Sequence, residues 1–289
     1  MITTLSNANI SIKVNSLGAE LWSLQQVGER YEYLWQGDEA YWASRSPVLF
    51  PIVGSVKNSE MMVDGIKYSL SNHGFSRKSE FELVEKTDIS LIYSLKYNEE
   101  TLSMYPFKFE LQLIYALRDY SVSISYIVKN LDTKEIFFQL GTHPGFNCPM
   151  DNATKLNDYY IEFESTENAK RLFVDENQMV VSDKEEEGLN SNVFKLEASK
   201  FYEGACIYRN LRSQSLTLKS DICDRFVKLD YTNFPYLGIW QKPDAPFICL
   251  EPWHGISDSD NFHGEFKDKE MMIALDIDQE YPCELIISI

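Results

Sequence analysis

Three short motifs each place an ionisable side chain directly before a glycine or proline that is followed by a large aromatic residue. They are Asn72–Phe75, Thr142–Phe146 and Leu250–Trp253, which contribute His73, His143 and Glu251. An apolar wall raises the pKa of a carboxyl group and lowers that of an imidazole, which brings both toward the range useful for proton transfer. Aromatic rings are also the usual contact surface for the apolar face of a sugar. The motifs therefore predict an enzyme that performs acid–base chemistry on a small polar molecule.

Two of the four histidines lie in rigid contexts. The glycine after His73 allows a ligand or another chain segment to approach closely, and the proline after His143 fixes the chain beyond the imidazole. A pre-positioned imidazole is what general acid catalysis requires. We therefore expect His143 and His73 to be functional, His254 at most to line the site, and His263 to be exposed.

Glu251 is the carboxylate most suited to acid–base catalysis. It ends the apolar run Pro246–Leu250 and is followed by Pro252 and Trp253. A carboxylate in that position must be paired, protonated or in use, because burying an unpaired charge is costly. A structural ion pair with an arginine such as Arg45 is the alternative to a catalytic role.

Two cations and one aromatic residue are candidates for substrate binding. Arg45 precedes the apolar run Val48–Val53, and an arginine entering a core strand usually has a fixed anionic or hydroxyl partner. Lys242 lies between Gln241 and a proline, which suits the rim of a site. Trp253 offers an aromatic wall next to Glu251.

Strands must position these residues, because alternation of apolar and polar residues dominates the chain. In Phe109–Leu117 the odd-numbered positions are all apolar, and in Tyr120–Val128 the even-numbered ones are. Only Arg118 and Asp119 separate the two runs, which predicts a hairpin. Similar runs are Leu91–Tyr97, Glu135–Leu140, Tyr159–Phe163, Ser215–Leu218, Arg225–Tyr231, Pro246–Leu250, Met271–Ile277 and Cys283–Ile289.

This pattern predicts an all-β fold, a large antiparallel β-sandwich formed as a single domain over residues 1–289. Alternating strands and helices are absent, which argues against a parallel sheet. We expect one helical turn near Ala198–Phe201. The polar stretch Asp175–Asn192 is predicted to be a solvated loop or a strand-poor insertion.

Composition excludes several classes of function. The formal net charge of −17 repels nucleic acid and anionic membranes. The five cysteines are widely spaced and odd in number, which favours buried thiols over disulfides or a zinc site. Nucleotide-binding and serine-hydrolase motifs are absent, as are a signal peptide and a long apolar run. We expect a cytoplasmic protein without cofactor or metal, whose partner is a small-molecule sugar.

An ordered set of motifs resembles the aldose 1-epimerases of the galactose-mutarotase-like superfamily, and most of all their bacterial LacX-type branch. The motifs are Leu17–Leu24, Arg45–Gly54, Asn72–Phe75, Tyr105–Phe107, Gly141–Phe146 and Cys249–Trp253. The resemblance implies a β-supersandwich. It also implies that His143 is the general acid, that Glu251 is the general base, and that His73 binds a sugar hydroxyl near the ring oxygen.

The chain departs from the family pattern at one position. Relatives of this branch often carry arginine after the Pro-Ile-Val-Gly run, where this chain has Ser55. If that arginine binds the substrate in the relatives, then in this chain Arg45 or Lys57 must take its place, or the substrate must differ from theirs. The acidic chain and the serine favour a neutral sugar over a sugar phosphate.

The predicted reaction is interconversion of the α and β anomers of a hexose by ring opening and closure. A non-catalytic carbohydrate-binding protein and a hexose-6-phosphate 1-epimerase are the alternatives. A metal enzyme using His73, His143 and Glu251 as ligands is a further rival, and a glycosidase would need a second carboxylate. The sequence does not distinguish among galactose, glucose, tagatose-pathway sugars and hexose 6-phosphates as the substrate.

Overall fold

The computed structural model describes residues 1–289, apart from the side chain of Glu187, and its secondary structure is almost entirely antiparallel strands. This confirms the predicted all-β antiparallel sandwich. In the described chain α1 (Glu99–Met104) is the one α-helix, and it is capped by the side chain of Asn98, which accepts from the Thr101 N–H. No described helix has the length and apolar character needed to cross a membrane.

Two large sheets make up most of the fold. The nine-stranded sheet has the order β17 (Val193–Lys195), β14 (Tyr159–Phe163), β19 (Ser215–Ser220), β20 (Cys223–Asp230), β24 (Glu280–Ser288), β10 (Ser121–Asn130), β9 (Phe109–Arg118), β8 (Ser90–Lys96) and β7 (Glu82–Lys86). The eight-stranded sheet has the order β16 (Val180–Leu189), β15 (Ala169–Val174), β18 (Cys206–Arg209), β21 (Tyr236–Trp240), β22 (Phe247–His254), β12 (Leu140–Thr142) and β4 (Val48–Leu49), with β13 (Gly145–Asn147) also paired to β22.

Smaller elements complete the fold. The remaining strands are β1 (Ile2–Ser6), β2 (Ile10–Asn15) and β3 (Glu20–Gln26) in one sheet, β5 (Glu60–Val63) with β6 (Ile66–Ser69), and β11 (Ile136–Phe138) with β23 (Ile273–Leu275). The 3-10 turns are η1 (Lys57–Ser59), η2 (Ser76–Lys78), η3 (Leu156–Asp158), η4 (Ala198–Phe201) and η5 (Phe266–Asp268). The turn η4 is the helical turn that the sequence predicts.

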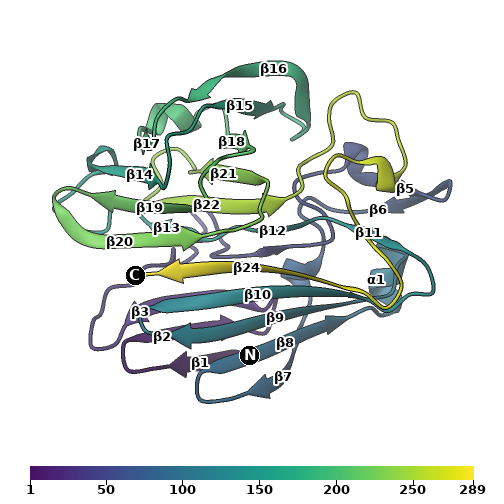
Figure 1. Ribbon diagram of the computed structural model, residues 1–289, viewed down its shortest axis with the longest axis horizontal. Helices are drawn as coiled ribbons and strands as arrows, with labels where there is room; N and C mark the ends of the chain where they lie inside the picture. Colours follow the sequence, from purple (N-terminus) through teal and green to yellow (C-terminus); the bar gives the residue numbers. More distant parts are fainter.

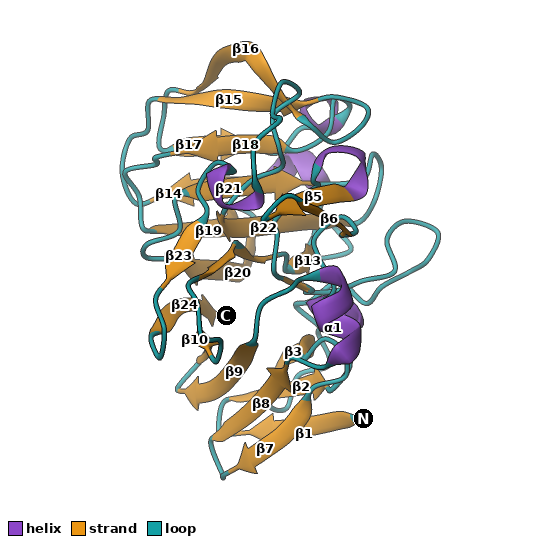
Figure 2. Cartoon of the chain, turned by 90° about the vertical axis from the view of Figure 1, so that its right-hand side faces the viewer, coloured by secondary structure: helices purple, strands orange, loops and turns teal.

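The two ends of the molecule are built from different parts of the chain. In Figure 1 and Figure 2, β7 to β9 lie beside β1 to β3 at one end, whereas β15 and β16 lie at the other. A single hydrophobic cluster runs from Leu5 to Ile289 and joins residues of both large sheets. The assignment of the chain to one domain stays a prediction.

The predicted hairpin is present as β9 and β10, which pair from Arg118 with Ser121 to Phe109 with Asn130. The predicted apolar positions of β9 are all buried. Tyr120 differs from the prediction, because it lies in the turn and is 50% exposed. The turn consists of Asp119 and Tyr120. Asp119 has a positive φ of 50°, which aspartate tolerates better than most residues do.

The prediction for Asp175–Asn192 is wrong in most of its length, because β16 occupies Val180–Leu189 and pairs with β15. As the edge of its sheet, β16 needs partners for its backbone on one side only. Its described polar side chains face solvent, and some form ion pairs across strands, such as Glu185 Oε1 with Arg209 Nη2 at 2.6 Å. Charged side chains on an edge strand also prevent pairing with other chains. High polarity therefore hid a strand rather than marking a loop.

Candidate active site

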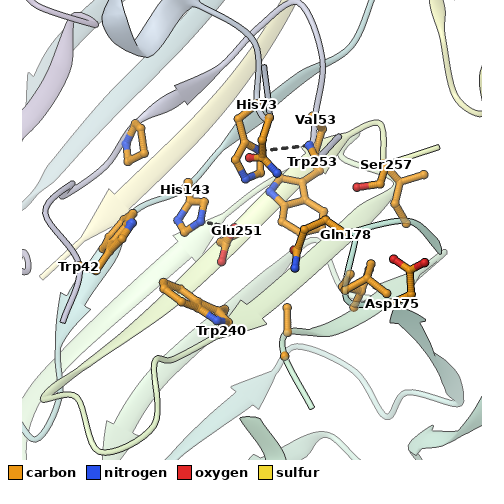
Figure 3. Close-up of a pocket in the computed structure, with 18 of the residues that line it drawn as sticks. Trp42, Val53, His73, His143, Asp175, Gln178, Trp240, Glu251, Trp253 and Ser257 are labelled. Carbon is orange, nitrogen blue, oxygen red and sulfur yellow. Dashed lines mark hydrogen bonds and ion pairs between the residues drawn. The ribbon is translucent and has the colours of Figure 1, made fainter. Parts of the chain in front are cut away.

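A pocket of about 590 Å³ opens on the eight-stranded sheet and contains all three predicted reactive side chains. His143, Glu251 and His73 line it although they are far apart in the sequence. Figure 3 shows His143 facing Glu251, with Trp42 and Trp240 on one side and His73 and Trp253 on the other. The predicted convergence of the motifs is therefore seen in the structure.

Glu251 lies in the middle of β22 and points into the pocket. Its carboxylate is 2% exposed, and Oε2 lies 3.1 Å from Nε2 of His143. The partner of Glu251 is therefore His143 and not Arg45, which was the structural alternative. In the sheet, Glu251 pairs with Gly238 of the neighbouring strand β21.

His143 follows β12 and is clamped by aromatic rings. Its imidazole stacks on Trp42 with a centroid distance of 4.8 Å and meets Trp240 edge-on at 5.8 Å. Within the described protein Nδ1 has no side-chain or backbone partner of good geometry. The other ring nitrogen, Nε2, is the one that faces Glu251.

His73 has a defined tautomer because of its backbone. The residue has a φ of 61°, and its Nδ1 accepts a hydrogen bond of 3.0 Å from the Gly54 N–H. Its own N–H donates to the Gly54 carbonyl at 2.7 Å. Since Nδ1 is an acceptor, a neutral His73 carries its proton on Nε2. The next residue, Gly74, must be glycine, because a Cβ there would lie 2.1 Å from the Phe50 oxygen.

Burial decides the protonation of the site. Burial lowers the pKa of His143 to about 3 and raises the pKa of Glu251 well above its usual value. The Trp253 indole N–H opposes the rise for Glu251, although it makes no hydrogen bond of normal geometry to any described residue. Burial, and then the charges of His143 and Arg77, lower the pKa of His73 well below its usual value. Burial therefore favours a neutral His143–Glu251 pair.

Trp253 lines the pocket as predicted, and two glycines make room for its indole ring. A Cβ on Gly141 would lie 2.9 Å from its Cδ1, and a Cβ on Gly238 would lie 2.7 Å from its six-membered ring. Both glycines lie on strands next to β22. The Trp253 indole can therefore lie beside Glu251 only because the strands on either side carry glycine at these two positions.

The two predicted substrate-binding cations lie outside the pocket. The Arg45 guanidinium stacks on Trp22 at 3.9 Å and donates to the Trp22 carbonyl and to Gln36. Lys242 Nζ donates to the Ala40 carbonyl at 3.2 Å. Arg45 contributes through its backbone instead: Glu20 accepts from the Arg45 N–H and holds the segment that carries Trp42.

The arginine of the pocket is Arg77, which the sequence analysis did not select. It lies in η2, four residues after His73, and its Nη2 donates to the Asn72 carbonyl at 3.0 Å. Lys57, the other proposed replacement, donates to the Asp260 carbonyl and does not line the pocket. The signal for Arg77 was its place two residues after the motif that contains His73. The outer residues Trp42, Trp240, Gln178 and Ser257 were also missed as site residues.

The remaining histidines lie outside the pocket. His254 Nδ1 is 2.6 Å from the Tyr281 hydroxyl, and the ring does not line the site. His263 is exposed, as expected, and lies beside η1 and η5. Neither ring is therefore placed to touch a molecule bound near Glu251.

A buried ion pair anchors the loop that follows β22 beside the pocket. Lys269 Nζ and Asp258 Oδ1 are 2.8 Å apart, and both side chains are at most 4% exposed. Asp258 also accepts from the Lys57 N–H, and its own N–H donates to the Ser55 carbonyl. These bonds tie the loop to the segment that bears Gly54.

The Asp258→Asn variant is expected to unfold more easily, because it leaves the Lys269 ammonium buried without a counter-ion. Breaking a buried pair in this way costs about 3–5 kcal/mol. Urea denaturation followed by tryptophan fluorescence measures the change. Replacing both partners, as in Asp258→Asn with Lys269→Met, should recover much of the loss. Equal stability of wild type and the single variant would contradict the role of the pair.

The fold and the site together define a class of protein. The chain belongs to the aldose 1-epimerase family, whose pattern matches residues 1–273. It is 34% identical to the plasmid-encoded protein LacX of Lactococcus lactis subsp. lactis over 271 residues, which cover 90% of this chain and 89% of the relative. The predicted resemblance is thereby confirmed.

Solved structures show the same fold along the whole chain. A galactose mutarotase related enzyme from Lactobacillus acidophilus superposes with a TM-score of 0.95 at 31% identity, covering 100% of this chain and 97% of the other. A galactose mutarotase-like protein from Lactobacillus casei gives a TM-score of 0.94 at 30% identity, covering 100% and 99%.

Proposed function

We propose that this protein is a mutarotase that interconverts the α and β anomers of a free hexose. The observation that supports this most directly is the 3.1 Å contact between Nε2 of His143 and Oε2 of Glu251 in a pocket walled by tryptophans. Opening a hexose ring requires removal of a proton from the C1 hydroxyl and donation of a proton to the ring oxygen. Two proton-transfer groups in contact can do both in one bound pose.

The reaction balances with the one proton that Glu251 and His143 share, which must move from Glu251 to His143 across their 3.1 Å contact before the ring opens. Glu251 as carboxylate removes the C1 hydroxyl proton, and protonated His143 donates to the ring oxygen as the C1–O5 bond breaks. The open aldehyde then faces a neutral His143 and a protonated Glu251, which is the state that burial favours. Rotation about C1–C2 and the reverse transfers close the ring as the other anomer and return both protons. No redox step takes place.

The second imidazole of the site, His73, suits a binding role. Because His73 Nδ1 accepts from Gly54, its Nε2–H is free to donate toward the pocket. Its ring lies edge-on to that of His143, with centroids 5.7 Å apart. A donor at this distance from the acid can hold a sugar hydroxyl or the ring oxygen during transfer. Trp42, Trp240 and Trp253 supply apolar surface for the sugar ring.

The charges around the pocket favour a neutral sugar. Its outer wall contains the acidic residues Asp175, Glu176 and Glu203, and the cation among the described lining residues is Arg77. Arg77 already donates to the Asn72 carbonyl. A phosphate group needs several cationic or N–H partners, so these acids oppose its binding.

We expect a hexose 6-phosphate to compete no better than the free hexose. The measurement is inhibition of anomer exchange, followed by polarimetry or saturation-transfer NMR across a panel of aldoses that includes galactose and glucose. Inhibition by the phosphate at a tenfold lower concentration would instead indicate a sugar-phosphate epimerase. In that case Arg77→Met should weaken binding of the hexose 6-phosphate but not of the free hexose. This difference separates recognition of the phosphate group from tight binding of the sugar itself.

A carbohydrate-binding protein on the same fold is the second candidate. Binding alone explains the tryptophans, but it does not need an imidazole and a carboxyl group in contact inside a buried site, which is costly to maintain. The aldose panel separates the two functions. Sugar binding without acceleration of anomer exchange for any aldose would support the binding protein.

A further inference from the structure

Cys249 places a thiol next to the proton-transfer pair. It lies two residues before Glu251 on β22, so the two side chains share one face of the strand. The ligand atoms of His143, Cys249 and Glu251 all lie within 4.8 Å of one another, and all three residues are buried. The proposed reaction makes no use of this thiol.

We propose that His143, Cys249 and Glu251 form an inhibitory site for a thiophilic divalent cation, Zn²⁺ or Cd²⁺. Imidazole nitrogen, thiolate sulfur and carboxylate oxygen are the three ligand types that zinc takes in proteins. Sites with three protein ligands leave the fourth position to water or another small molecule. The cation occupies the same two groups that would otherwise transfer protons to and from a sugar.

The spacing of the pair fits such an ion. With metal–ligand distances of roughly 2.0–2.2 Å, a nitrogen and an oxygen on a tetrahedral zinc ion lie about 3.3 Å apart. The observed separation of His143 Nε2 and Glu251 Oε2 is 3.1 Å. His143 and Glu251 line the pocket, whereas Cys249 lies behind them in a cluster with Trp35 and Phe247. The fourth position therefore faces the pocket.

The charges also balance. A thiolate, a carboxylate and a neutral imidazole around a dication give a net charge of zero, which a buried site tolerates far better than a bare ion. Binding exchanges one dication for two protons, one from the thiol and one from the His143–Glu251 pair.

The first test is a cadmium titration of the metal-free full-length protein. Binding is followed by the ultraviolet absorption of the cadmium–thiolate bond and by calorimetry. We expect one site in the wild type, weakened at least about 100-fold in Cys249→Ser because a ligand is lost. Cys206→Ser is the matched control, because Cys249 and Cys206 are 0% and 1% exposed and Cys206 lies outside the cluster. Unchanged affinity in Cys249→Ser would overturn the proposal.

A second measurement protects the test against a variant that does not fold. Anomalous scattering from wild-type crystals soaked in CdCl₂ should place the ion between His143, Cys249 and Glu251. Cadmium found only at other positions would refute the site. Because binding is measured directly, the result does not depend on the mutarotase proposal. If anomer exchange is found, Zn²⁺ should inhibit it, EDTA should restore it, and Cys249→Ser should be insensitive.

Discussion

The Glu251→Gln variant is expected to slow anomer exchange by ~10²-fold or more, because glutamine keeps the shape of the side chain and cannot accept the C1 hydroxyl proton. The fold should survive, since a neutral amide replaces a carboxyl group that burial already drives toward its neutral form. Sugar binding should largely survive as well. Polarimetry measures the exchange, and the fluorescence of the tryptophans that line the pocket measures binding.

Glu167→Gln is the matched control for this variant. Glu167 is also 2% exposed, but its two carboxylate oxygens accept from the Arg212 and Ser213 N–H groups, and it does not line the pocket. An amide there turns one acceptor into a donor that faces an N–H, so the control should lose stability and keep activity. Glu251→Gln should show the opposite. Near-normal exchange in a folded Glu251→Gln protein would leave the binding-protein function as the better explanation.

The sequence predicts the strands well where each has one buried face. In β9 and β10 the alternation of apolar and polar residues sets which side chains enter the core, and the register follows from the short turn. Edge strands lack this constraint. The strand β16 is stabilised by its backbone pairing with β15 and by cross-strand ion pairs, so its sequence resembles a solvated loop.

The reactive centre is also predictable from sequence, whereas its cations are not. His73 lies in a turn, His143 follows the end of β12, and Glu251 lies within β22 between an apolar run and a proline, so their local sequence carries the signal. The direction of a long flexible side chain is set by tertiary contacts. Arg45 turns away because Trp22 and Gln36 offer it a stacking surface and acceptors. Arg77 reaches the pocket because η2 follows directly from the turn that bears His73.

Replacing His143 by asparagine should reduce anomer exchange to a similar extent as Glu251→Gln. Asparagine fills part of the space under Trp42, but it has no group that can carry the proton to the ring oxygen. The loss should appear in kcat more than in KM, because the interaction that is removed forms in the transition state. His254→Asn is the control, since that imidazole bonds to Tyr281 outside the pocket. A loss confined to KM would assign His143 to binding alone.

The double variant tests whether the two groups act as one unit. If His143 and Glu251 worked independently, each loss of ~10²-fold would multiply to ~10⁴-fold. Because the two side chains are in contact at 3.1 Å and each transfer requires the other, removing either already abolishes the relay. We therefore expect the double variant to be little slower than either single variant. Full multiplication of the two losses would mean that separate groups serve the C1 hydroxyl and the ring oxygen, with the His143–Glu251 contact playing no part in proton transfer.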